Sequence, residues 1–174
     1  MDNRASVLYN EKKGGSSVFF SIYPSPLGNL TLTSDGDALT GLWMETQTLP
    51  PAEYIRRDTI PVLIQTKKWL DDYFLGNQPD PGTLPLSPAG TEFQQLVWQH
   101  LRSIPYGQTL TYGCIAKAIS PIMSAQAVGG AVGRNPIGII IPCHRCIGAN
   151  GQLTGYAGGI ENKAWLLRHE EETK

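Results

Sequence analysis

The residues best suited to chemistry are Cys143, His144 and Arg145, which follow Pro142 in the stretch IIIPCHRCIG. A thiol is a good nucleophile as a thiolate, and a neighbouring His or Arg favours that form. Adjacent side chains point apart in an extended chain, so we expect a bridging water to relay a proton from the thiol to the imidazole. The imidazole also needs an acceptor to orient it, and Glu170 in RHEEE is a candidate by residue type only.

The pair Cys143 and Cys146 has other interpretations, because C-x-x-C also occurs in redox pairs and zinc sites. No second ligand pair has suitable spacing for zinc, and a redox pair usually opens a helix after an early strand. Free cysteines are also common as small buried apolar residues. From these residues alone, a nucleophile and a core cysteine are equally supported.

The element that must position Cys143 is predicted to be a strand over residues 137–141, IGIII. Proline cannot donate to a sheet ladder, so Pro142 ends this strand or places it at a sheet edge. Three helices are predicted before it. The first opens on a capping-box pattern, Thr91 with Gln94, and the others cover TLTYGCIAKAIS and MSAQAVGGAVGRNP. The last two resemble a helix-turn-helix.

The third of these helices carries almost no side-chain bulk, since its residues include Ala125, Ala127, Gly129, Gly130 and Gly133. A glycine costs about 1 kcal/mol relative to alanine inside a helix, so this composition needs a compensating benefit. Tight packing against a neighbouring helix and close approach to a large rigid ligand, such as a duplex, explain it equally well.

The first half of the chain predicts a small α/β domain. Residues 18–44 alternate apolar runs with turn residues, which is typical of a three-stranded antiparallel meander. Apolar residues at helical spacing follow in PVLIQTKKWLDDYFLG and stop at Gly76. We expect an extension over 1–17, an N-terminal domain over 18–76, a proline-rich connector over 77–90 and a C-terminal domain over 91–174.

Charge is divided unevenly between the two halves of this 174-residue chain, whose net charge is −1. Residues 1–90 hold seven Lys or Arg against ten Asp or Glu, and residues 91–174 hold seven against five. The basic excess is compatible with a polyanion partner for the C-terminal half only. No apolar run is long enough for a membrane span, and three cysteines do not suit a disulfide framework. We therefore expect a cytoplasmic protein that binds no membrane.

Two long stretches carry a resemblance to a known family. They are FQQLVWQHLRSIPYGQTLTYGCIA and NPIGIIIPCHRCIGANGQLTGYAGG, and KAWLLRHE follows the second. Over residues 91–170 this pattern strongly resembles the O6-alkylguanine–DNA alkyltransferases. The resemblance implies an α/β N-terminal domain, a small antiparallel sheet plus helix with a ribonuclease H-like fold. It also implies a mainly α C-terminal domain with a winged helix-turn-helix.

The activity implied by the resemblance is DNA repair by direct reversal. The alkyl group of O6-alkylguanine, and of O4-alkylthymine, would pass irreversibly to Cys143 in a single turnover. The implied partner is double-stranded DNA carrying alkylated bases, with the target nucleotide flipped out through the minor groove. The resemblance implies no cofactor and no metal. We expect a monomer, and cooperative loading on DNA stays open.

The resemblance also implies roles for individual residues. Cys143 would accept the alkyl group, His144 would act as base through a water, Glu170 would hold its tautomer and Asn135 would brace the turn. Residues implied to line the base pocket are Tyr112, Tyr156, Cys146, Ala157, Gly158, Gly159 and Lys163. Residues implied to contact DNA are Ser124, Ala125, Gln126, Ala127, Gly129, Arg134 and Arg145.

The chain departs from the family pattern at three positions. Gln126 stands where an arginine usually fills the gap left by the flipped base, which puts the strength of extrusion in doubt. Ala157 replaces a frequent serine, and Cys146 replaces a frequent aliphatic residue. A lesion sensor on the same scaffold is the main alternative, although such relatives lack the acceptor cysteine. A Cys-His-Glu hydrolase and a transcriptional regulator are further alternatives.

Overall fold

The computed structural model describes residues 17–174, and the expected extension over 1–17 lies almost wholly outside them. Turn residues divide the first segment as predicted, into β1 (Val18–Ser25), β2 (Gly28–Ser34) and β3 (Leu39–Met44). These strands pair antiparallel in sequence order. Gly28 begins β2 at φ +90°, a conformation that suits glycine. The predicted meander is therefore confirmed.

A fourth strand was not predicted. β4 (Tyr54–Arg56) has only three residues and pairs parallel with the start of β1, giving the order β3-β2-β1-β4. The sheet is therefore mixed rather than purely antiparallel. A strand this short has too few residues to show a two-residue alternation, and its partner is distant in the sequence.

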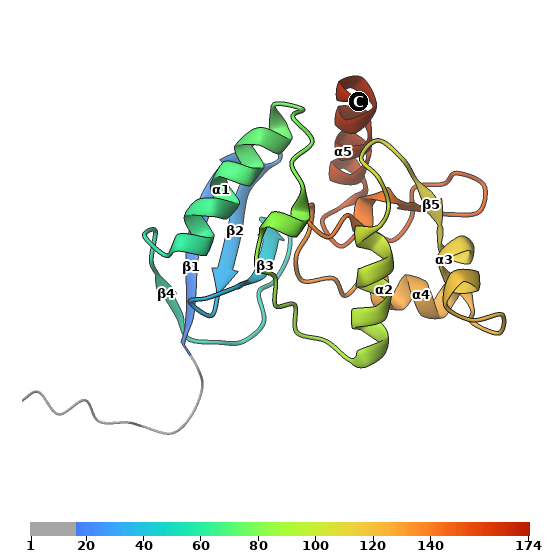
Figure 1. Cartoon of the computed structure of the whole chain (residues 1–174), viewed down its shortest axis with the longest axis horizontal. Helices are drawn as coiled ribbons and strands as arrows, with labels where there is room; N and C mark the ends of the chain where they lie inside the picture. Colours follow the sequence, from blue (N-terminus) through green and yellow to red (C-terminus); the bar gives the residue numbers. More distant parts are fainter. Residues whose placement is uncertain (1–16) are drawn as a thin grey trace, which may run out of the picture.

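Helix α1 (Pro61–Phe74) covers one face of this sheet (Figure 1). It starts with proline in the first turn, where a missing N–H costs nothing, and the chain leaves it at Gly76 with φ +81°. Its apolar stripe, which includes Leu63 and Leu70, is fully buried with the sheet residues Leu30 and Leu32. The helix predicted in PVLIQTKKWLDDYFLG is confirmed.

The segment predicted as a connector runs along the edge of the sheet. It contains a short 3-10 helix, η1 (Pro81–Thr83), and then forms a bridge to β3. Leu39 N donates to Pro85 O at 2.8 Å, and Ser87 N donates to Leu39 O at 2.8 Å. The chain beyond η1 is thus tied to the sheet before it reaches the second group of elements.

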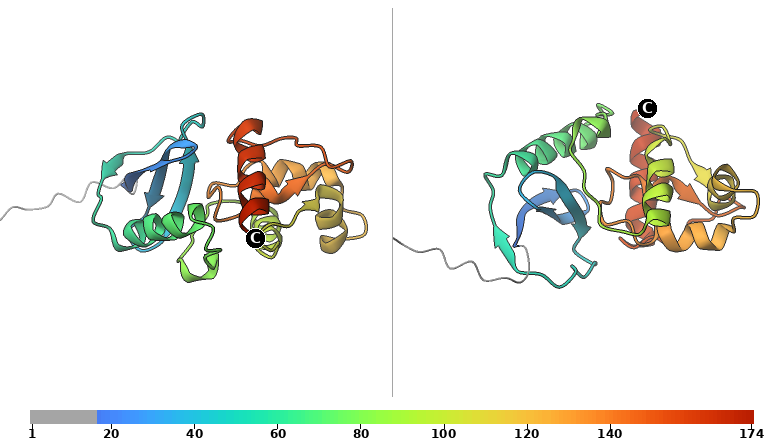
Figure 2. Two further views of the ribbon diagram at one scale, coloured as in Figure 1. Left: turned by 90° about the horizontal axis from the view of Figure 1, so that it is seen from above. Right: turned by 60° about the horizontal axis from the view of Figure 1, so that its bottom comes forward.

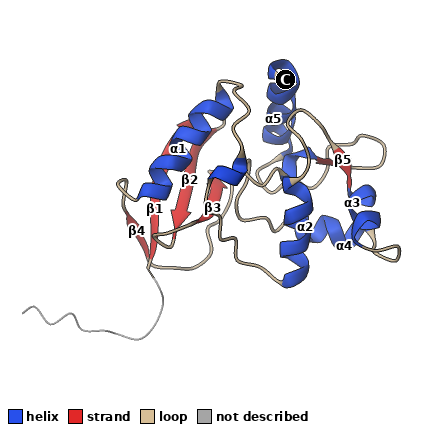
Figure 3. Ribbon diagram, in the orientation of Figure 1, coloured by secondary structure: helices blue, strands red, loops and turns tan. Residues whose placement is uncertain are grey.

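The C-terminal elements are mainly helical and lie beyond β3 in every view (Figure 2). The capping box is confirmed, because Thr91 and Gln94 exchange side-chain to backbone hydrogen bonds. A small parallel pair of strands accompanies the helices (Figure 3). The elements are α2 (Glu92–Arg102), β5 (Leu110–Thr111), α3 (Tyr112–Ile119), α4 (Ala125–Val132), η2 (Cys143–Arg145), β6 (Cys146–Ile147) and α5 (Ile160–Thr173). No helix in residues 17–174 is long and apolar enough to cross a membrane.

The strand predicted over residues 137–141 is wrong. Ile139 has φ +66°, which an extended strand does not allow, and Ile140 N bonds Gly138 O only two residues back. Branched apolar residues favoured a strand, but burial rather than sheet pairing explains them here. Among the described residues, this segment pairs with the sheet through one isolated bridge, in which Leu42 N donates to Pro136 O at 2.9 Å and Leu42 O accepts from Gly138 N at 3.2 Å. The free edge of β3 therefore holds the segment that leads to Cys143.

Candidate active site

Cys143 is the first residue of the single-turn helix η2 (Cys143–Arg145), and it is only 7% exposed to solvent. Burial raises the pKa of this thiol above its ordinary value, although nearby Asn135 and Lys163 oppose the rise. The resting side chain is therefore a neutral thiol. It needs a base to take its proton before the sulfur can attack.

His144 and Glu170 form a fully buried pair, with Nε2 of the imidazole 2.6 Å from Oε1 of the carboxylate. Burial lowers the pKa of His144 below its ordinary value, despite the opposing effect of Glu170, so the ring is neutral at neutral pH. A neutral ring that donates from Nε2 to a carboxylate carries its lone pair on Nδ1. Within residues 17–174 that Nδ1 has no hydrogen-bond partner, so it is the nitrogen available to accept a proton.

The Glu170 carboxylate is held by several donors besides His144. Arg145 donates from Nε to Oε2 at 2.9 Å and from Nη2 to Oε1 at 3.0 Å, while Gly107 N donates to Oε2 at 3.1 Å. Tyr73 OH donates to Oε1 at 2.8 Å. Burial would raise the pKa of Glu170, but the hydrogen bonds and charges of His144 and Arg145 hold it well below its ordinary range. The carboxylate is therefore ionised and fixed in place.

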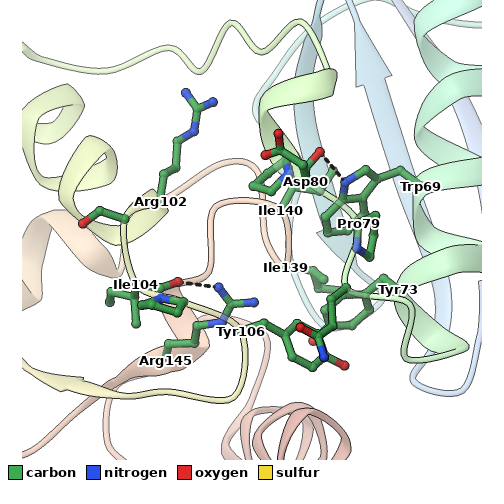
Figure 4. Close-up of a pocket in the computed structure, with 14 residues that line it drawn as sticks. Trp69, Tyr73, Pro79, Asp80, Arg102, Ile104, Tyr106, Ile139, Ile140 and Arg145 are labelled. Atoms are coloured by element: carbon green, nitrogen blue, oxygen red, sulfur yellow. Dashed lines mark hydrogen bonds between the residues drawn. The ribbon is translucent and has the colours of Figure 1, made fainter. Parts of the chain in front are cut away.

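Arg145 faces the interior rather than a DNA surface. Its Nη1 donates to Ile104 O at 2.7 Å, and its guanidinium lies 5.5 Å from the ring centre of Tyr106. It borders a pocket of about 200 Å³ between the two groups of elements (Figure 4). The expected DNA contact at Arg145 does not fit this position, because its charge is neutralised by Glu170 and its donors point inward.

Asn135 closes the turn that precedes Cys143. Its Nδ2 donates to Ile141 O at 2.8 Å, and its Oδ1 accepts from Ile137 N at 3.0 Å. The side chain is buried, so each of these polar atoms needs such a partner. These bonds replace the ladder that a strand would have supplied, and they fix the irregular backbone that presents Cys143.

A second polar cluster surrounds the carbonyl of Cys146. Lys163 is buried, and its Nζ donates to that carbonyl and, at 3.2 Å, to Thr154 O. Tyr112 OH donates to the same Thr154 oxygen at 3.0 Å, and the Lys163 ammonium lies 5.8 Å from the Tyr112 ring centre. Burial raises the pKa of the Cys146 thiol to about 12, so this second cysteine stays protonated.

The loop of residues 156–159 packs against the N-terminal sheet. A Cβ added at Gly158 would collide with Sδ of Met44, which lies at the end of β3. Asn162 Nδ2 donates to Gly158 O at 2.8 Å, and Gly159, at φ +93°, starts α5. A side chain at position 158 would therefore have to displace the side chains of Met44 and Tyr156.

Helix α4 presents most of its small residues to the exterior, while Ala131 faces the core. Ser124, Ala125, Gln126 and Ala127 are all exposed, and Ser124 caps the helix by accepting from Ala127 N. A Cβ at Gly130 would meet no atom within 4 Å. Internal packing therefore does not require glycine there, which favours close approach to an external ligand. Arg134, just beyond the helix, is also exposed.

The described part of the chain contains no group of three His, Cys, Asp or Glu side chains that could hold a metal ion. The C-x-x-C motif also lacks the surroundings of a zinc site. Lys163 occupies the carbonyl of Cys146, and no second ligand pair faces the two thiols.

Comparison with known proteins decides between the remaining interpretations. Residues 92–172 match the DNA binding domain of 6-O-methylguanine DNA methyltransferase, and residues 18–88 match its ribonuclease-like domain. The methylated-DNA–protein-cysteine methyltransferase of Haemophilus influenzae is 43% identical over 157 residues, which cover 90% of this chain and 88% of that protein. The chain belongs to the 6-O-methylguanine DNA methyltransferase family.

Other members show the same relationship. The Mycobacterium leprae methylated-DNA–protein-cysteine methyltransferase is 46% identical over 147 residues, covering 84% of this chain and 88% of that protein. The crystal structure of Mycobacterium tuberculosis OGT in complex with DNA superposes with a TM-score of 0.79 at 42% identity, covering 90% of this chain and 94% of the other. The expected fold, a small sheet domain followed by a helical DNA-binding domain, is confirmed.

In this methyltransferase the structure gathers Cys143, His144, Glu170 and Asn135 around one buried turn. Sequence reasoning missed Tyr73, the contribution of α1 to the same cluster. A signal was available, because Tyr73 lies on the apolar face of a predicted helix, and a buried tyrosine hydroxyl usually finds a partner. The identity of that partner, 97 residues away, could not be read from the spacing.

Proposed function

We propose that this protein repairs DNA by direct reversal, transferring the alkyl group of O6-alkylguanine, and of O4-alkylthymine, to Cys143. The sulfur forms a bond to the alkyl carbon while the carbon–oxygen bond breaks, and its electron pair stays on the base oxygen. His144 takes up the thiol proton through a water, and the released base anion takes up one proton. The product thioether has no easily displaced group, so each molecule reacts once.

The observation that carries this proposal is the His144–Glu170 pair in a chain of this family. The carboxylate fixes the tautomer that leaves Nδ1 free to accept a proton, on the residue next to a neutral buried thiol. Asn135 acts by bracing the turn. Because the thiol is neutral at rest, it becomes a strong nucleophile only when the neighbouring base takes its proton.

The partner of the protein is DNA. A modified base inside a duplex is out of reach of a buried thiol, so the nucleotide must leave the stack. We assign α4 to the minor groove, with Ser124, Ala125, Gln126, Ala127 and Gly129 facing it and Arg134 near a phosphate. We assign the pocket for the extruded base to Tyr112, Tyr156, the backbone of residues 157–159, Lys163 and the Cys146 carbonyl.

We further propose that the protein acts as a monomer in the cytoplasm. The acceptor must stay a free thiol, and reducing compartments preserve free thiols. All three cysteines are free in the structure.

The proposed function is tested with a duplex carrying one O6-methylguanine whose methyl group is isotopically labelled. We expect the label to move to the protein and unmodified guanine to be restored, with the yield limited to one methyl per protein molecule. A matched duplex with normal guanine should label nothing. Preferential binding without transfer would instead support a lesion sensor, and release of labelled methanol with turnover would support a hydrolase.

A further inference from the structure

Tyr73 connects the N-terminal domain to the catalytic carboxylate. It lies on α1, its side chain is completely buried, and its hydroxyl donates to Oε1 of Glu170 at 2.8 Å. Oε1 also accepts hydrogen bonds from Nε2 of His144 at 2.6 Å and from Nη2 of Arg145 at 3.0 Å. The same carboxylate oxygen therefore accepts hydrogen bonds from α1 and from η2. The Tyr73 hydroxyl and the His144 imidazole compete for the negative charge of Glu170.

The orientation of Tyr73 is fixed on several sides. Its ring stacks on Trp69 with centroids 5.5 Å apart, and meets the edges of Phe74 and Tyr106 at 5.3 and 5.8 Å. Its backbone carbonyl lies 2.8 Å from Nε2 of His169 on α5. In Figure 4, Tyr73 lies with Tyr106 along one wall of the pocket between the two domains. The hydroxyl is thus placed by packing and not by Glu170 alone.

Burial and the charge of Glu170 raise the pKa of Tyr73 well above its ordinary value. The hydroxyl is therefore protonated throughout the range from about pH 5 to about pH 9. It always donates and never competes as an acceptor for the proton of His144.

We propose that Tyr73 is a positioning residue for the alkyl transfer, which holds Glu170 in place and limits how strongly that carboxylate raises the basicity of His144. This inference rests on the proposed function. It assigns the N-terminal domain a direct part in the chemistry, in addition to holding the segment 136–138 at the edge of β3.

The titratable and polar groups that lie near this pair come from four parts of the chain. Removing the hydroxyl of Tyr73 leaves more charge on Oε1 for His144 and so favours the protonated imidazole. Fewer molecules then carry a free Nδ1 in mildly acidic solution. The groups are Tyr73 on α1, Tyr106 and the N–H of Gly107 before β5, Cys143, His144 and Arg145 on η2, and Lys163, His169 and Glu170 on α5.

The test compares single-turnover rates of methyl transfer from an O6-methylguanine duplex across pH 5 to 9, for the full chain and for Tyr73→Phe. Phenylalanine keeps the ring and its packing and removes only the donor. We expect the acid limb of the rate profile to move to higher pH, so that the variant is about fivefold slower in its steep region, the size expected for the loss of one typical intramolecular hydrogen bond.

Tyr106→Phe is the matched control, because its hydroxyl contacts Thr173 at 2.6 Å and not Glu170. It should keep the wild-type acid limb. A second test combines Tyr73→Phe with Glu170→Gln, where the first change should no longer move the limb because no carboxylate remains to transmit it.

The outcomes separate the two proposals. If the wild type transfers no methyl group, the proposed function is wrong. If the wild type reacts and Tyr73→Phe keeps the same acid limb, with or without a lower Tm, Tyr73 has only a structural role. Should Tyr73→Phe fail to fold, 3-fluorotyrosine at position 73 provides a stronger donor of nearly the same size. It is then expected to move the limb to lower pH, and an unmoved limb would overturn the inference.

Discussion

Nε2 of His144 lies 2.6 Å from Oε1 of Glu170, and both side chains are inaccessible to solvent. This contact determines which imidazole nitrogen can act as the base. With Nε2 donating to the carboxylate, Nδ1 carries the lone pair, and burial keeps the ring neutral. The thiol that it serves is neutral as well, since burial raises the pKa of Cys143.

The pH dependence of the reaction follows from the lowered pKa of His144 and the raised pKa of Cys143. The pKa of His144 is lowered by burial, so its free base persists below the ordinary value and the rate falls only in acid. The pKa of Cys143 is raised by burial, so direct ionisation adds nothing near neutrality. We expect a rate constant that is flat between about pH 7 and 9. Rapid-quench transfer assays measure it, and a tenfold rise per pH unit over this range would show that a solvent-ionised thiolate reacts without His144.

Replacing Glu170 with glutamine should cost both rate and stability. The change leaves the buried Arg145 guanidinium without its counter-charge, and removing one partner of a buried ion pair typically costs about 3–5 kcal/mol. Urea unfolding measures this loss. Glu171→Gln is the control, because among residues 17–174 that exposed carboxylate pairs only with Lys174 at the surface, and it should change the free energy of unfolding by less than about 0.5 kcal/mol. Equal effects of the two variants would contradict the buried network.

Substitutions at Gly130 distinguish a requirement for internal packing from a requirement for DNA contact. A Cβ there meets no atom within 4 Å, so Gly130→Ala should raise the free energy of unfolding by up to about 1 kcal/mol through helix propensity. Gly130→Leu should also fold, but its bulk should weaken binding to duplex DNA at least about tenfold if α4 lies in the groove. Fluorescence anisotropy with a duplex measures the affinity. If the affinity of Gly130→Leu for the duplex is unchanged, α4 does not lie in the minor groove.

Gln126→Arg should strengthen binding to a lesion duplex. The position is exposed near the start of α4, where an added cation approaches the phosphates or enters the gap left by an extruded base. One more phosphate contact steepens the slope of log K against log salt by about 0.9. Gln65→Arg, on the exposed side of α1, adds the same charge away from α4 and should leave the slope unchanged. If both variants steepen the slope equally, the added charge acts on DNA binding regardless of its position.

Local signals predicted much of the fold, and the site roles of Cys143, His144, Glu170 and Asn135 came from the family resemblance. The capping box of Thr91 and Gln94 and the meander depend on residues close in sequence, and the structure shows the contacts expected of them. The contacts that sequence reasoning missed are long-range. The pairing of β4 with β1 and the bond from Tyr73 to Glu170 join segments that no periodicity relates.

Two expectations differ from what the structure shows, and burial is part of the reason for each. Residues 137–141 are branched and apolar because they are buried, and burial alone does not distinguish a strand from a braced turn. The family resemblance implied that Arg145 contacts DNA, but in the structure its guanidinium binds the buried carboxylate of Glu170. That partner lies 25 residues away in the sequence, so no local pattern could have indicated it.

The central claim is that Cys143, and not Cys146 or Cys114, accepts the alkyl group. The most direct measurement is the intact mass of the protein after reaction with a duplex carrying one O6-methylguanine, followed by peptide mapping. We predict a gain of one methyl group, located on Cys143, that is abolished in Cys143→Ser and retained in Cys146→Ser. A methyl group on another residue, or no gain in mass while the lesion duplex is bound, would contradict this account.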